Sequence, residues 1–74
     1  MPVTRYIIIP LNQLRKVITI ITQHPKVGVF REGVVDKKVA LSLIGEEFEV
    51  EKLLGEMKRV VKIKTLDKLP KDYL

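Results

Sequence analysis

The sequence predicts a single α+β domain in which two helices cover one face of a four-stranded antiparallel sheet. Three observations predict this class: a short chain, a high apolar content and two alternating hydrophobic periods. The chain has 74 residues, of which 46% are apolar and none is cysteine, so one hydrophobic core must hold residues 1–74 together without disulfides. Strand-like and helix-like patterns follow one another in the order strand, helix, strand, strand, helix, strand.

The first strand is predicted over residues 3–9, where Tyr6–Ile9 is apolar on both faces, as in a central strand. Pro10 ends the strand, because proline has no N–H to donate to a neighbouring strand. Asn12 is then expected as the N-cap of a helix that ends at Gln23-His24-Pro25, since the residue before a proline leaves the helical region. Four apolar residues at helical spacing form the expected buried face of this helix: Leu14, Val17, Ile18 and Ile21.

The second and third strands are predicted over residues 26–31 and 38–44. Between them, Glu32-Gly33 and Asp36-Lys37 are competing turn signals, so the tip of the hairpin is left open. Strand alternation divides the two segments between the faces of the sheet. In the third strand, Val39, Leu41 and Leu43 are expected to face the helices, and Ala40, Ser42 and Ile44 the opposite side. In the second strand, Val27 and Val29 share one face and Gly28 and Phe30 the other, so either Phe30 or Val29 is expected to join the side opposite the helices.

The second helix is predicted over residues 46–59, after Gly45 has interrupted the third strand. Its apolar residues form one stripe, which is expected to be buried: Val50, Leu53, Leu54 and Met57. Gly55 lowers the stability of this helix by about 1 kcal/mol relative to alanine, and it suits the close approach of another element. The last strand is predicted over residues 60–66, and residues 67–74 form a short polar tail.

These elements make two right-handed βαβ units joined by a hairpin, which is the ferredoxin-like plait with strand order 4-1-3-2. The segment HPKVGVFREGVVDKKVALSLIGEEFEVEKLLGEMKRVVKIKTL resembles the second half of small ferredoxin-like modules. In heavy-metal-associated domains, a "GV…V" strand is followed by a "KK-V-x-V-x-G" strand and an "EKLL…L" helix. The segment is also similar to amino-acid-sensing ACT domains and to NIL and Lrp-type effector domains, which share this layout.

The resemblance implies a fold rather than a function. Heavy-metal-associated domains hold their metal on a CxxC between the first strand and the first helix, where this chain has Pro10-Leu11-Asn12-Gln13 and no cysteine. ACT domains often have a glycine at the same junction, which is also absent here. Metal transport by the CxxC mechanism is therefore excluded, and neither a metal nor a cofactor is expected. A small effector, if one binds, is expected at this junction: Pro10, Leu11, Asn12 and Gln13.

The sequence predicts no catalytic group. His24 is the only histidine, and its place at the end of a helix indicates a structural role. Ser42 is the only serine and lies within a predicted strand, with no histidine nearby to activate it. Glu46-Glu47 begins a helix, where acidic residues are favoured by the helix dipole. Acylphosphatases share the topology, but their arginine lies in a glycine-rich loop, and the loop before Arg15 is too short to hold a phosphate.

The formal net charge of +5 is unevenly distributed. Residues 46–56 hold five glutamates and one lysine, whereas residues 57–71 hold six cations and one aspartate. The helix dipole favours this polarity, and a basic surface for nucleic acid is the alternative interpretation. The expected phosphate contacts are Arg5, Lys38, Lys62 and Lys64. RNA-recognition motifs stack bases on aromatic residues of the first and third strands, and here only Tyr6 and Phe30 are available to the sheet face.

The sheet face that points away from the helices is the expected site of interaction, because it is apolar. Its expected interface residues are Ile8, Phe30, Ala40, Ser42 and Ile44. We therefore expect a non-catalytic interaction or regulatory module that forms a homodimer or binds another protein through its sheet, with basic nucleic-acid binding as the alternative. The apolar stretch Tyr6–Ile9 is too short for a signal peptide and no apolar run approaches roughly 18 residues, so a soluble cytoplasmic protein is expected.

Overall fold

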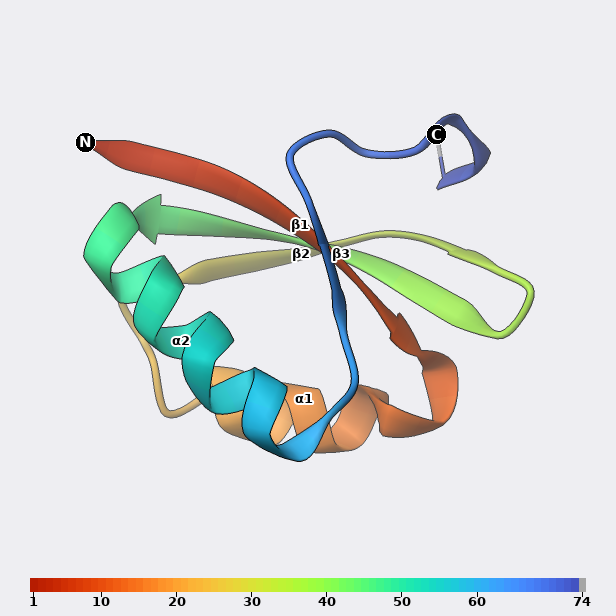
Figure 1. Cartoon of the computed structure of the whole chain (residues 1–74), viewed down its shortest axis with the longest axis horizontal. Coiled ribbons are helices and arrows are strands. Elements are labelled where there is room, and N and C mark those ends of the chain that lie inside the picture. The colour runs from red at the N-terminus through yellow and green to blue at the C-terminus, as the bar shows by residue number, and fades with distance from the viewer. Residues whose placement is uncertain (74) are drawn as a thin grey trace.

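The computed structural model describes residues 1–73, which form one four-stranded antiparallel sheet and two α-helices (Figure 1). The elements follow one another as β1 (Pro2–Pro10), η1 (Leu11–Gln13), α1 (Leu14–Ile21), β2 (Gly28–Val35), β3 (Lys38–Glu46), α2 (Glu47–Val60), β4 (Lys64–Leu66) and η2 (Lys71–Tyr73). The strand order is β2-β3-β1-β4. This arrangement confirms the predicted βαββαβ class and is consistent with a ferredoxin-like fold.

The inner strands β1 and β3 pair along their whole length, from Pro2 opposite Glu46 to Pro10 opposite Lys38. On its other side β1 pairs only with the short strand β4, through Tyr6, Ile7 and Ile8. The continuous apolar run of β1 therefore belongs to a central strand, as predicted.

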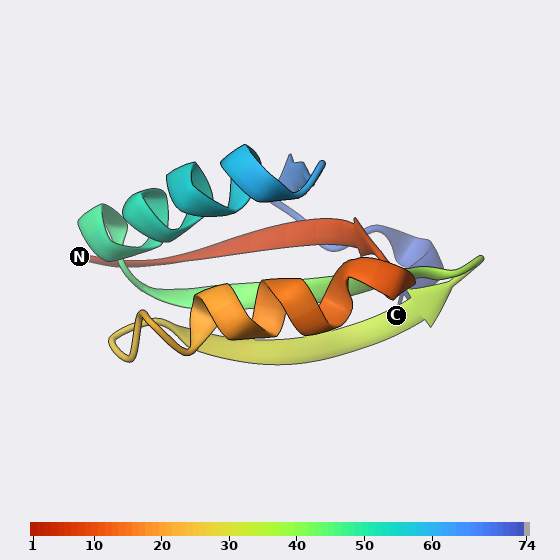
Figure 2. The same cartoon turned by 90° about the horizontal axis from the view of Figure 1, so that it is seen from below.

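Both helices lie on the same face of the sheet (Figure 2). The core lies between the sheet and the two helices, and all three contribute buried apolar residues to it. They include Ile7, Ile9, Val17, Ile21, Val39, Leu41, Leu43, Val50, Leu53, Leu54 and Met57. The predicted stripe of the second helix and the predicted helix-facing residues of the third strand are confirmed. Two predictions for the first helix are wrong: Ile18 is exposed, and Leu14 is only partly buried.

The start of α1 also differs from the prediction. Asn12 lies inside the 3-10 turn η1, and the α-helix begins at Leu14, with Gln13 as an N-cap that makes no side-chain capping bond. The physical reason is a tertiary hydrogen bond. The N–H of Leu11 donates to the carbonyl of Lys37 at 2.8 Å, which ties the chain after β1 to the hairpin before the helix can begin.

The tip of the β2–β3 hairpin is Asp36-Lys37, whose φ angles are 50° and 64°. Left-handed angles at both central positions are those of the type I′ turn, which suits a two-residue hairpin. The competing signal at Gly33 lies in a β-bulge between Arg31 and Gly33, so β2 continues beyond its predicted end to Val35.

The other two glycines that the sequence singled out behave differently from expectation. Gly45 does not end β3, which continues to Glu46. A Cβ at Gly45 would lie 3.1 Å from the carbonyl oxygen of Lys26, so this glycine permits the close approach of the loop before β2. Gly55 was expected to permit a close approach, but a Cβ there would meet no atom within 4 Å.

The C-terminal residues 67–73 do not form a simple polar extension. After β4, the chain passes along the face of the sheet that is opposite the helices (Figures 1 and 2). It ends in η2, whose backbone lies against β2: a Cβ at Gly33 would be 2.9 Å from the carbonyl oxygen of Tyr73. We call residues 67–73 the tail.

Candidate functional site

The strand register shows which residues share the sheet face opposite the helices, which we call the outer face. Ile7 and Ile9 lie in the core, so the even-numbered residues of β1 point away from it. Their partners make three cross-strand rows. The rows are Gly28, Ile44 and Thr4; then Phe30, Ser42, Tyr6 and Leu66; then Gly33, Ala40, Ile8 and Lys64.

One half of the outer face is covered by the chain itself. Ala40 and Ser42 are 0% and 2% exposed, although they lie on the face opposite the helices. The tail passes over this region, and Tyr73 reaches Gly33 at its far side. The expectation that Ala40 and Ser42 lie on an uncovered surface is therefore wrong, because the tail folds back over the sheet.

A hydrogen bond crosses the covered half. The hydroxyl of Ser42 donates to the Glu32 carboxylate, with 2.7 Å between Oγ and Oε2. Glu32 is the extra residue of the bulge in β2, and the bulge directs the Glu32 side chain over the outer face. The only serine of the chain is thus a buried donor to a carboxylate.

The other half of the outer face is uncovered. Phe30 is 57% exposed and Ile44 is 38% exposed. A Cβ at Gly28 would lie 3.8 Å from Cε2 of Phe30, so the phenyl ring leans along β2 over this glycine. Thr4 and Tyr6 lie in the same rows and are partly buried. We call these five residues, none of which is charged, the outer patch.

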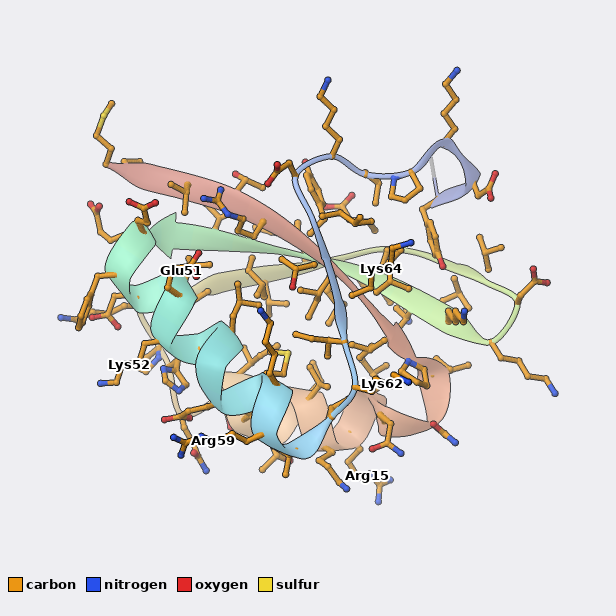
Figure 3. All side chains as sticks on the ribbon, viewed as in Figure 1. Arg15, Glu51, Lys52, Arg59, Lys62 and Lys64 are labelled. Atoms are coloured by element: carbon orange, nitrogen blue, oxygen red, sulfur yellow. The ribbon has the colours of Figure 1, made fainter. Side chains whose placement is uncertain are left out.

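The predicted phosphate contacts fall into two groups. Lys38, Lys62 and Lys64 line one hollow of about 360 Å³ together with Ile8, Ile9, Pro10 and Ile63. Lys62 lies just before β4 and Lys64 is its first residue, and both lie apart from Glu51 on α2 (Figure 3). The structure does not bring Arg5 to this group. Its side chain lies on the helix side of the sheet, 3.9 Å from the carboxylates of Glu47 and Glu51.

The predicted effector junction lies beside these lysines. A second hollow, of about 540 Å³, is lined by Pro10, Leu11, Asn12, Asp36, Lys37 and Lys38. The two hollows share Pro10 and Lys38, so we call them together the basic groove. Gln13 is not part of it, because its side chain lines a different hollow with Arg15 and Val60.

His24 is buried and joins the loop after α1 to the second helix. Its Nε2 lies 2.8 Å from Oε2 of Glu56. The hydrogen bond from His24, together with the positive charges of His24, Lys52 and Arg59, holds the pKa of the Glu56 carboxyl below its ordinary value. The pair thus ties the two helical segments together, and the sequence alone gave no signal for the partner of His24.

Within residues 1–73, no group of three or more His, Asp or Glu side chains is placed to hold a metal ion. No helix in the same range has the length and apolar content needed to cross a bilayer. Comparisons with known protein families, with curated proteins and with solved structures give no match to this chain.

Proposed function

We propose that this protein is a non-catalytic association module and that its outer patch packs against the same patch of a second copy. The observation that carries the proposal is the pair of large apolar side chains, Phe30 and Ile44, exposed next to each other on a sheet face. Contiguous exposed apolar surface on a small domain marks a site of interaction.

The distribution of charge favours a second copy at this position. Two identical chains of net charge +5 repel each other, so they can only approach closely through a region without cations. The outer patch meets this condition, because Gly28, Phe30, Ile44, Thr4 and Tyr6 carry no charge. At its edge, the N-terminal amine of Met1 is neutralised by Glu46 at 3.0 Å.

The size of the domain gives a second reason. A chain of 74 residues gains little stability from one small core, and self-association is a common source of further apolar burial. A specific dimer buries about 800 Å² on each partner. The protein exposes 5180 Å² in total, so an interface of this size would cover roughly a sixth of its surface.

Sedimentation of Phe30→Lys against a matched control tests the proposal. The control is Phe48→Lys, because Phe48 is 73% exposed but lies on α2, on the other side of the sheet. We expect Phe30→Lys to weaken association at least about tenfold, since two buried lysines would face each other across the interface. Phe48→Lys should associate like the wild type. A wild type that stays monomeric at high micromolar concentration, or equal loss in both variants, would contradict the proposal.

Nucleic-acid binding is the second candidate function. It is favoured by Lys38 at the start of β3 and by Lys62 and Lys64 at β4, which line one hollow although they come from two separate segments. Affinity should then fall steeply with added salt, because each lysine that meets a phosphate releases a counterion. Lys62→Gln with Lys64→Gln should flatten this salt dependence. If neither single nor double strands bind at about 50 mM salt, this candidate is excluded.

A further inference from the structure

We infer that the basic groove binds a phosphate ester, with its lysines around the phosphate and its apolar residues against the organic part. The inference does not rest on the proposed dimer, because the groove and the outer patch share no residue.

The groove exists because the sheet is incomplete at this end. β4 has only three residues and pairs with Tyr6, Ile7 and Ile8. No strand accompanies Ile9 and Pro10 on that side, so Lys62 and Ile63 line an opening beside the end of β1. Proline suits this position, since it has no N–H that a missing strand would leave without a partner.

The wall on the hairpin side is held by the backbone. The left-handed turn at Asp36-Lys37 brings Lys38 back beside Pro10. The carbonyl of Lys37 accepts the N–H of Leu11 at 2.8 Å, which fixes the turn against the start of η1. A fixed wall reduces the entropy that is lost when a ligand binds.

The charges of the groove are not compensated within the described chain. Lys37, Lys38, Lys62 and Lys64 line it, against one acid, Asp36. Among residues 1–73, no carboxylate lies within 4.0 Å of any of these four amines. Elsewhere in residues 1–73, Arg5 and His24 approach glutamates, whereas the lysines outside the groove also lack a carboxylate within 4.0 Å. The groove differs from the rest of the surface because four such lysines line it together. Lysines that converge without counter-charges favour a dianion over a single negative charge.

Apart from Asn12, the remaining lining of the groove is apolar. Ile8, Pro10 and Ile63 line one hollow with the lysines, and Leu11 continues this surface into the other. Inorganic phosphate would contact only the amines, whereas a phosphate ester would also cover apolar surface and gain from its removal from water. A nucleoside phosphate has both parts, and it occurs either free or within a nucleic-acid strand.

Titration of the isotope-labelled full chain with adenosine monophosphate, followed by NMR of the backbone amides, tests the inference. We expect saturable shifts at the amides of residues 8, 9, 11, 12, 36–38 and 62–64, with a dissociation constant in the millimolar range or below. Adenosine and inorganic phosphate should each bind at least about tenfold more weakly, since each lacks one of the two contacts. Titration with oligothymidylate distinguishes a nucleic-acid strand from a free nucleotide as the natural ligand. Shifts at the same amides with tighter binding than adenosine monophosphate indicate nucleic acid, and weaker binding than adenosine monophosphate indicates a free ligand.

Matched lysine variants distinguish binding in the groove from unspecific attraction of the ligand to the positively charged protein. Lys38→Gln and Lys64→Gln should each weaken binding of adenosine monophosphate by about threefold to tenfold. Lys58→Gln removes the same charge from an exposed position on α2 outside the groove and should change binding less than twofold or so. The inference is overturned by a lack of saturable shifts in the groove, by equal affinity for adenosine, or by an equal loss in Lys58→Gln. Sedimentation of the same samples reports the proposed dimer separately.

Discussion

The two halves of the outer face belong to the same strands but are built from different residues. Under the tail lie small side chains, Gly33, Ala40 and Ser42, which leave room for the backbone of Tyr73 to approach. In the uncovered half, the corresponding positions of β2 and β3 carry the large side chains Phe30 and Ile44. One half is thus shaped for a segment of the same chain, and the other offers apolar area that the chain does not cover.

Alternation along a strand therefore assigns a residue to a face of the sheet but does not determine whether that face is covered. Ser42 and Ile44 are two residues apart and lie on the same face, yet one is buried and the other exposed. What separates them is the course of the tail, which depends on contacts between distant segments.

Leu53→Ala removes a fully buried side chain from the core that supports both halves. We expect the free energy of unfolding to fall by about 2–5 kcal/mol, from lost apolar burial and the cavity that remains. Denaturant unfolding followed by circular dichroism measures the change. An effect below about 1 kcal/mol would contradict the placement of this residue in the core.

Gly33→Ala acts on the covered half alone. The new Cβ would lie 2.9 Å from the carbonyl oxygen of Tyr73, so the tail must shift or leave the sheet. We expect a loss of about 1–3 kcal/mol in the free energy of unfolding and faster amide exchange in the tail.

Gly55→Ala is the matched control for this change. Its new Cβ meets no atom within 4 Å, and alanine favours a helix, so the free energy of unfolding should rise by about 0.5–1 kcal/mol. If both glycine variants change stability in the same direction, this result would contradict the close approach of the tail to β2.

Ser42→Ala tests the hydrogen bond within the covered half. The Glu32 carboxylate is exposed and can turn to water, so we expect a loss of about 0.5–1.5 kcal/mol in the free energy of unfolding. Glu32→Gln, which keeps an acceptor oxygen, should lose less. A larger loss in Glu32→Gln than in Ser42→Ala would argue against this bond.

The smallest effect is expected from the pair of His24 and Glu56, which lies apart from the outer face. The pKa of Glu56 is lower in the folded protein than its ordinary value of 4.5, so the folded state favours the charged carboxylate. Its contribution to stability is present above that ordinary value and is lost as the pH falls through the lowered value. Unfolding measured against pH should show a weaker acid dependence for Glu56→Gln than for the wild type, with association unchanged.

The fold could be predicted from the sequence because its signals are local. The apolar run of β1 and the stripe of α2 each depend on residues within one element, and both are confirmed. The boundaries were less predictable. The turn at Asp36-Lys37 competed with Gly33, whose role depends on the tail and not on its neighbours in sequence.

The candidate sites were harder to predict from the sequence, because they depend on contacts between segments that are distant along the chain. Three of the four predicted phosphate contacts meet at one hollow, but Arg5 belongs to the opposite face, which only the register of β1 decides. The burial of Ala40 and Ser42 could be predicted only if the path of the tail were known. Its only signals were Leu69, Pro70 and Tyr73, apolar or aromatic residues without a regular period.

Association through the outer patch can be tested in the wild type by following the backbone amide shifts on dilution. Between about 1 mM and about 10 µM protein, a homodimer of moderate affinity dissociates. We predict that the shifts of Thr4, Gly28, Phe30 and Ile44 change over this range, while those of Gly33 and Ala40 do not. Shifts that are independent of concentration, or that change equally in both halves, would contradict association through the uncovered half of the sheet.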